Sequence, residues 1–145
     1  MKHLLDTSVL VAACVERHPR HGASLRCYRE ALQPGNEFRA AAHSVAELYA
    51  VLTRLPVRPP VPPGVARRLV RENVLERAEV IELDGADYAA VLDRMADNGL
   101  TGGAIYDALV VQAALKSTVD RVHTWNATDF RRVWPDAGAR LHVLD

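Results

Sequence analysis

Apolar and polar positions change their spacing several times along the 145 residues of the chain. Short apolar or alternating runs indicate strands, and longer runs with apolar residues three and four positions apart indicate helices. The predicted strands span residues 3–5, 38–42, 79–83, 121–124 and 140–144, and the predicted helices span 9–16, 23–32, 44–55, 65–77, 86–98, 101–117 and 126–133. Because strand and helix alternate without internal repeats, we expect a single α/β domain over residues 1–145, with a parallel sheet sandwiched by helices.

Composition and charge add limits to this picture. The 18 basic and 18 acidic residues cancel, so net charge indicates neither nucleic-acid nor membrane binding. Cys14 and Cys27 stand apart in helical stretches, and we expect both to be small core residues. The proline-rich stretch 55–64 is too short to link two domains. Neither a signal leader nor a membrane-spanning run is recognisable, so we expect a soluble, cytoplasmic protein without membrane contact.

The first predicted strand ends in an acid. Asp6 stands where strand gives way to helix, and Thr7 and Ser8 follow it. One interpretation is structural, since any of these side chains can cap the helix by accepting a hydrogen bond from a free backbone N–H. The other is functional, because in an open parallel sheet this junction lies at the carboxyl edge, where ligands bind. The choice depends on whether other acids occupy equivalent positions.

Glu47 and Asp107 lie in comparable places. Ser44 and Glu47 fit the S-x-x-E capping box, yet they also follow a predicted strand directly. Asp107 lies in a helix that is apolar almost all round, where a carboxylate costs roughly several kcal/mol unless something pairs with it. The sequence offers it no lysine or arginine within one helical turn. A nearby helix N-terminus offsets at most ~1 to 2 kcal/mol, so a divalent cation explains Asp107 better.

Asn126 and Asp129 form a fourth polar position after a predicted strand, although Asn126 also suits a helix cap. Acids gathered at one sheet edge repel one another unless a cation neutralises them. Ligands that offer only oxygen favour Mg²⁺ or Mn²⁺ over zinc. Such ions hold phosphates and activate water, so the pattern indicates hydrolysis of a phosphodiester.

Four stretches in this order and spacing, LLDTSVLVA, SVAELYAVLTRLP, YDALVVQAA and VHTWNATDF, carry a resemblance to a known family. The chain resembles the PIN-domain ribonucleases, most closely the VapC-type toxins of toxin-antitoxin pairs. The resemblance implies a three-layer α/β/α sandwich and a Mg²⁺- or Mn²⁺-dependent endoribonuclease. It places the family's acidic positions on Asp6, Glu47 and Asp107, with hydroxyl support from Thr7 or Ser8 and from Thr124.

One departure from the family pattern concerns the fourth ligand. Many members carry an acid two residues after the threonine, where this chain has Asn126. The N-x-x-D arrangement of Asn126 and Asp129 occurs in related sequences, so we expect activity, and either residue can complete the metal site. The resemblance also implies RNA as substrate, a homodimer, and a VapB-like antitoxin whose tail binds beside the site, on residues 46–74.

Competing interpretations remain open at this point. A catalytically silent PIN-like module that binds RNA or protein is the main alternative, because Asn126 can signal a weakened site. A haloacid-dehalogenase-like phosphatase needs a second acid two residues after the first, and Ser8 excludes it. Four arginines are candidates either for contacts with the RNA backbone or for solvated or salt-bridged surface positions: Arg39, Arg67, Arg68 and Arg71.

Overall fold

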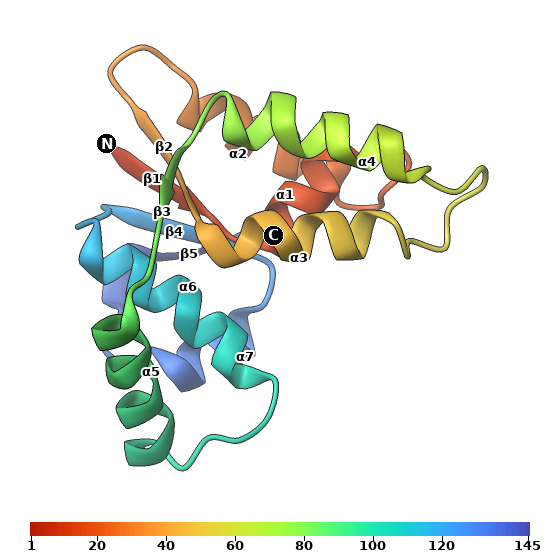
Figure 1. Ribbon diagram of the computed structural model, residues 1–145. Coiled ribbons are helices and arrows are strands. Elements are labelled where there is room, and N and C mark those ends of the chain that lie inside the picture. The colour runs from red at the N-terminus through yellow and green to blue at the C-terminus, as the bar shows by residue number, and fades with distance from the viewer.

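The computed structural model describes residues 1–145 and contains one five-stranded sheet in the order β3-β2-β1-β4-β5 (Figure 1). Every pair of neighbouring strands is parallel. The strands are β1 (Lys2–Leu5), β2 (Glu37–Ala41), β3 (Glu79–Ile81), β4 (Arg121–Thr124) and β5 (Leu141–Val143). The helices are α1 (Thr7–Cys14), α2 (His21–Ala31), α3 (Ala42–Leu52), α4 (Pro63–Val70), α5 (Gly85–Asp97), α6 (Ala104–Lys116) and α7 (Ala127–Val133), with a π-helical turn η1 (Arg71–Leu75) and a 3-10 turn η2 (Gly138–Arg140).

Helices cover both faces of the sheet. In Figure 1, α1, α2, α3 and α4 lie on one side of the strands, and α5, α6 and α7 lie on the other. Each group encloses its own hydrophobic core, with 16 buried residues on the first side and 17 on the second. The predicted three-layer α/β/α sandwich is therefore confirmed. None of the helices combines the length and the apolar character needed to cross a membrane.

Strand β1 lies at the centre of the sheet, between β2 and β4. Consecutive residues of a strand point to opposite faces, so Leu4 enters the core beside α6 while Leu5 enters the core beside α1. A central parallel strand is buried on both sides, which explains why its sequence is apolar without alternation.

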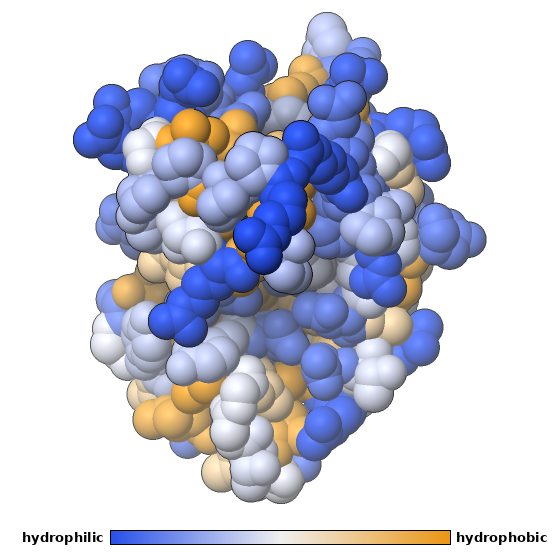
Figure 2. Space-filling model, turned by 90° about the vertical axis from the view of Figure 1, so that its right-hand side faces the viewer, coloured by the Kyte–Doolittle hydropathy of each residue, from blue (hydrophilic) through white to orange (hydrophobic).

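The strand order identifies the edge where a ligand would bind. From β1 the chain continues outward to β2 and β3, then crosses back to add β4 and β5 on the other side. In such sheets the crevice lies outside the carboxyl ends of the strands where the order reverses, here β1 and β4. Figure 2 looks at the side toward which β1 runs in Figure 1, and hydrophilic residues cover the middle of this face.

The predicted helix starts differ from the structure by one to three residues, and two of these differences have a clear physical reason. Helix α3 begins at Ala42 directly after β2, with Ala41 as its N-cap residue, so Ser44 lies inside the helix and not at its cap. Helix α6 begins at Ala104 and not at residue 101, because Gly102 adopts a left-handed backbone conformation with φ of 60°. The predicted helix 65–77 is confirmed in its position, but it consists of α4 followed by the π-helical turn η1.

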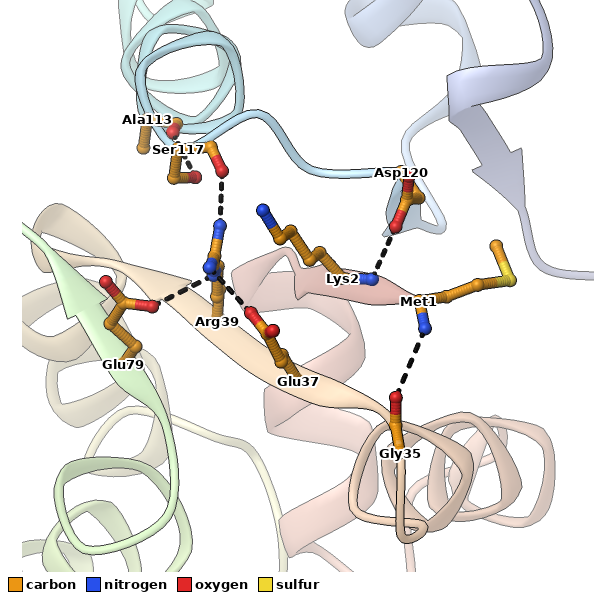
Figure 3. Close-up of polar contacts among 9 residues, drawn as sticks. All are labelled: Met1, Lys2, Gly35, Glu37, Arg39, Glu79, Ala113, Ser117 and Asp120. Carbon is orange, nitrogen blue, oxygen red and sulfur yellow. Dashed lines mark hydrogen bonds and ion pairs between the residues drawn. The ribbon is translucent and has the colours of Figure 1, made fainter.

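The structure contradicts the suggested RNA contact of Arg39. Its side chain is only 10% exposed, and Figure 3 shows it held between neighbouring elements. Arg39 Nη2 lies 2.7 Å from Glu37 Oε2, Arg39 Nε lies 3.0 Å from Glu79 Oε2, and Nη1 donates to the Ser117 carbonyl oxygen. Arg39 is thus a buried structural residue that joins β2 to β3 and to the end of α6. Arg67, Arg68 and Arg71 are exposed.

Candidate active site

Asp6 is the most enclosed acid of the predicted site. Asp6 follows β1 directly and is only 3% exposed. Its backbone N–H donates to the His123 carbonyl oxygen on β4 at 3.0 Å. The hydroxyls of Ser8 and Thr124 both donate to Asp6 Oδ2, at 2.8 and 2.9 Å. Asp6 occupies the N-cap position of α1, yet its side chain makes no capping hydrogen bond. The contacts of this side chain with two hydroxyls favour the functional interpretation of Asp6 over the capping one.

These contacts determine the charge state of Asp6. Burial raises the pKa of its carboxyl, and the hydrogen bonds from Ser8 and Thr124 act in the opposite direction. The Thr7 hydroxyl beside it is buried and has no hydrogen-bond partner. The hydroxyls of Ser8 and Thr124, and not that of Thr7, thus hold Oδ2 of Asp6 in place.

Glu47 lies on α3, at a helix position that faces the end of β1. Its carboxylate Oε2 is 3.1 Å from Nε2 of His43, one helical turn earlier, and not in a capping box with Ser44. Ser44 is buried and its hydroxyl has no partner, so the capping-box interpretation is wrong. Burial raises the pKa of Glu47, and the charge of Asp6 raises it further.

Asp107 lies on the first turn of α6 and has no basic partner. Burial raises its pKa to about 7, and the charges of Asp6, Asp129 and Glu47 add to this effect. Acids from four elements that are distant in sequence are therefore close enough in space to repel one another. This convergence is the arrangement that the sequence predicted.

Asn126 and Asp129 lie at the start of α7. The Asn126 backbone N–H donates to Thr124 Oγ1 at 2.9 Å, while its exposed side chain makes no capping hydrogen bond. Asp129 is exposed too, and it contributes to the raised pKa of Asp107. The helix-cap interpretation of Asn126 is therefore wrong, and both side chains remain available to a ligand.

The acids suit a hard cation that keeps part of its water shell. No group of three or more His, Cys, Asp or Glu side chains is arranged so that it could hold a metal ion directly. Mg²⁺ is commonly bound through one or two carboxylates and several waters, which needs no close cage of ligands. The mutual repulsion at Asp107 and the unpartnered buried hydroxyl of Thr7 are the features that a hydrated cation would satisfy.

A cleft of about 260 Å³ opens beside this cluster. It contains residues of the predicted site and others that the sequence did not single out for function. The cleft is lined by Thr7, Ser8, Val11, His18, Arg20, Glu47, Val51, Leu55, Trp125 and Asn126.

Sequence reasoning also missed the aromatic pair next to Glu47. The rings of His43 and Tyr106 stack in parallel, with centroids 5.0 Å apart. The spacing of four residues between His43 and Glu47 is a signal that could have indicated their contact. The pairing of His43 with Tyr106 joins α3 to α6, and nothing in the local sequence indicates it.

A second groove lies between α3 and α4 and has a volume of about 560 Å³. It falls almost entirely within residues 46–74, where the resemblance placed the antitoxin. The groove is lined by Val45, Ala46, Tyr49, Pro63, Gly64, Arg67, Val70, Arg71 and Leu75.

Comparison with known proteins agrees with the fold. A model of the PIN domain matches residues 3–134. Ribonuclease VapC40 of Mycobacterium tuberculosis is 34% identical over 105 residues, which are 72% of each protein. Ribonuclease VapC27 of the same species is 37% identical over 112 residues, covering 76% of this chain and 74% of that protein.

Solved structures show the same architecture at lower sequence identity. VapBC2 from Rickettsia felis, bound to a DNA fragment from its promoter, has a TM-score of 0.71 at 19% identity and covers 100% of both chains. VapC20 of Mycobacterium tuberculosis, described as a sarcin-ricin loop cleaving toxin, has a TM-score of 0.71 at 15% identity, over 88% of this chain and 92% of that one. On the family match and the two curated relatives, this chain belongs to the PIN-domain family, among the VapC ribonucleases.

Proposed function

We propose that this protein is a metal-dependent endoribonuclease, the toxin of a toxin-antitoxin pair, acting on RNA in the cytoplasm. The observation that carries the proposal is the convergence of Asp6, Glu47 and Asp107 without a lysine or arginine partner. Burial raises the pKa of each carboxyl, and the charge of Asp6 raises the pKa of Glu47 and Asp107 further. A purely structural cluster of acids would be destabilising, whereas a nuclease uses such a cluster to bind cations.

The side chains of the site have distinct roles in this proposal. Asp6, Glu47 and Asp107 would hold a hydrated Mg²⁺ or Mn²⁺, in part through its water molecules, with Asn126 or Asp129 as a further oxygen ligand. When bound, the ion supplies the charge that neutralises a phosphate and lowers the pKa of a water molecule. Ser8 and Thr124 keep one oxygen of Asp6 fixed through their hydrogen bonds, which leaves its other oxygen free to face the site.

His43 supports the site from outside the acidic cluster. Its contact with Glu47 restrains the carboxylate on α3, and its stacking on Tyr106 restrains the imidazole in turn. The rigid core under α3 and α6 thus limits the movement of both Glu47 and Asp107. A site restrained in this way needs less reorganisation when it binds a phosphodiester.

The test is cleavage of total cellular RNA by the purified protein, free of any antitoxin, with Mg²⁺ or Mn²⁺ and with EDTA. We expect cleavage only with a metal, and a loss of at least about 100-fold in Asp6→Asn and Asp107→Asn, because several kcal/mol of charge stabilisation disappear. Asp93→Asn, at an exposed position on α5, is the matched control and should cleave like the wild type.

Two results would contradict the proposal. Cleavage that persists in Asp107→Asn would remove this residue from the site. Binding of RNA without cleavage under any metal would favour the silent PIN-like module. Asn126→Asp would then be the first variant to test for cleavage. Circular dichroism of each variant separates loss of activity from loss of fold.

The partner in this proposal is a VapB-like antitoxin that docks in the groove between α3 and α4. Tyr49 and Leu75 line this groove and are 41% and 49% exposed, although they are large and apolar. Arg67 and Arg71 stand beside them, so the groove suits an apolar segment with acidic residues. A homodimer is expected from the family and stays a prediction.

A further inference from the structure

The cleft beside the acidic cluster contains a basic group that the proposed chemistry does not use. Arg20 and His18, from the segment between α1 and α2, line the same cleft as Glu47 and Asn126. Glu47 is the one carboxylate of this lining. A cleft that joins an acidic cluster to unpaired hydrogen-bond donors suits a ligand with more than one phosphate.

Arg20 is oriented without being neutralised. Its Cζ atom lies 4.5 Å from the ring centroid of Trp125, and it forms no ion pair with any acid of the chain. Arg20 is exposed, and its guanidinium carries five N–H donors, none of which forms a hydrogen bond with this chain. An arginine held in this way keeps its hydrogen-bonding capacity for a ligand.

The aromatic support under Arg20 is itself fixed. Trp125 Nε1 donates to Ser24 Oγ at 2.9 Å, and Ser24, on α2, is completely buried. Trp125 follows β4 directly, and its backbone N–H donates to Ser8 Oγ at 3.1 Å. Ser8 therefore contacts both Asp6 and Trp125, which connects the position of the tryptophan to that of the candidate catalytic acid.

His18 offers a second donor in the same cleft. Its Nδ1 accepts a hydrogen bond from the backbone N–H of Arg20 at 3.1 Å. In the neutral ring the proton is then on Nε2, which is a donor. Arg20 and His18 thus present donors to the cleft, while its apolar lining comes from Val11, Val51 and Leu55.

We propose that Arg20 binds a phosphate of the RNA strand next to the one that is cleaved, with Trp125 as the residue that orients it and His18 as a second donor. This inference rests on the proposed nuclease function, and it assigns the cleft to substrate and not to the antitoxin. A planar guanidinium with free donors matches two phosphate oxygens. Because a phosphate carries no sequence information, the contact positions the strand and does not select bases.

The test measures binding of a fluorescently labelled single-stranded RNA of mixed sequence in EDTA, at several salt concentrations. We expect Arg20→Ala to weaken binding about 10-fold and to reduce the slope of log Kd against log salt by about 0.7, the value for one lost phosphate contact on a single strand. Arg20→Lys should recover the slope but only part of the affinity, because it keeps the charge and loses the planar fork.

Two further variants control for position and orientation. Arg29→Ala removes an exposed arginine from α2 without touching the cleft, and should bind RNA like the wild type. Trp125→Leu keeps Arg20 and removes its support, so it should weaken binding while most of the salt slope remains. In metal-dependent cleavage of total RNA, Arg20→Ala should lose more activity at limiting than at saturating protein.

The outcomes separate this inference from the proposed function. If the wild type cleaves RNA and Arg20→Ala binds it as Arg29→Ala does, the inference is wrong and the nuclease function stands. If Arg20→Ala weakens binding of the antitoxin and leaves RNA binding unchanged, the cleft belongs to the protein partner and the inference is again wrong. If the wild type neither cleaves nor binds RNA, the function itself fails.

Discussion

Asp107 lies close to Asp6, Glu47 and Asp129, and burial together with their charges raises its pKa to about 7. Above that pH the folded protein holds a charged group that the unfolded chain would solvate, so the charge destabilises the fold. Asp107→Asn removes the charge and keeps the shape of the side chain. We therefore expect the variant to melt at a higher temperature than the wild type in EDTA at about pH 8.

Added metal should reverse this difference. Mg²⁺ stabilises a folded protein that binds it, so it should raise the melting temperature of the wild type and have a smaller effect on Asp107→Asn. The measurement is a thermal melt of both proteins with Mg²⁺ and with EDTA. Equal melting temperatures in EDTA would mean that Asp107 is better solvated than its surroundings indicate.

His123, a buried residue of β4, should make the stability of the fold depend on pH in the acid range. Its Nε2 lies 2.8 Å from Nδ1 of His3, and its Nδ1 lies 2.7 Å from Nδ1 of His142, so the rings form a chain across β1, β4 and β5. Burial lowers the pKa of His123 to about 3, and the neighbouring His142, His3 and Arg121 lower it further. His123 is thus neutral in the folded protein at neutral pH.

The sign of the pH effect follows from the two pKa values. Between the unfolded value of 6.5 and the folded value of about 3, the unfolded chain binds the proton more strongly. The free energy of unfolding therefore falls as the pH drops through this window. We expect the wild type to lose about 2 kcal/mol more than His123→Leu between about pH 7.5 and about pH 5, by urea denaturation. Parallel losses in the two proteins would contradict the expected shift.

At the scale of elements, α3 serves two surfaces. One face carries Glu47 into the acidic cluster, and another contributes Tyr49 to the groove shared with α4. Glu47 and Tyr49 belong to different surfaces of α3, so the helix can couple the acidic cluster to the groove only by moving as a whole. Variants in the groove should therefore separate partner binding from catalysis.

We predict that Tyr49→Asp weakens binding of the VapB-like antitoxin at least about 10-fold, because a charge replaces a large exposed apolar side chain. Cleavage of RNA should remain, and it should no longer be suppressed by the antitoxin. Tyr88→Asp is the matched control, since Tyr88 is 46% exposed on α5, away from the groove. Full suppression of Tyr49→Asp by the antitoxin would place the docking surface elsewhere.

The order and type of the elements could be predicted from the sequence because the spacing of apolar residues is a local property. The start of α3 could not, since β2 runs into the helix without a connecting residue and no side chain marks the cap. The capping box that Ser44 and Glu47 seemed to form is a local pattern that this direct junction overrides. Local patterns thus identify an element better than its first residue.

For the molecule as a whole, Asp6 and Glu47 could be predicted because each follows a strand end, and parallel strands bring those ends together. Asp107 could be predicted because it is an unpaired acid in an otherwise apolar helix. The pairs Arg20 with Trp125 and His43 with Tyr106 depend on how separate elements pack, which one sequence does not reveal. Arg39 was misassigned for the same reason, because its partner Glu79 lies on the neighbouring strand β3. Its charge indicated a surface position, whereas packing within the sheet buries its side chain.

The central position of β1 has a consequence for the time at which activity appears during synthesis. β1 is made well before β4, so it lacks one of its two neighbouring strands until residues 121–124 have been made. The hydroxyl of Thr124, which holds Asp6, stands 118 residues after it. A growing chain therefore contains Asp6, Glu47 and Asp107 before it can position them. A ribosome that stalls short of β4 is therefore expected to carry an inactive fragment, because Thr124 is not yet present to hold Asp6.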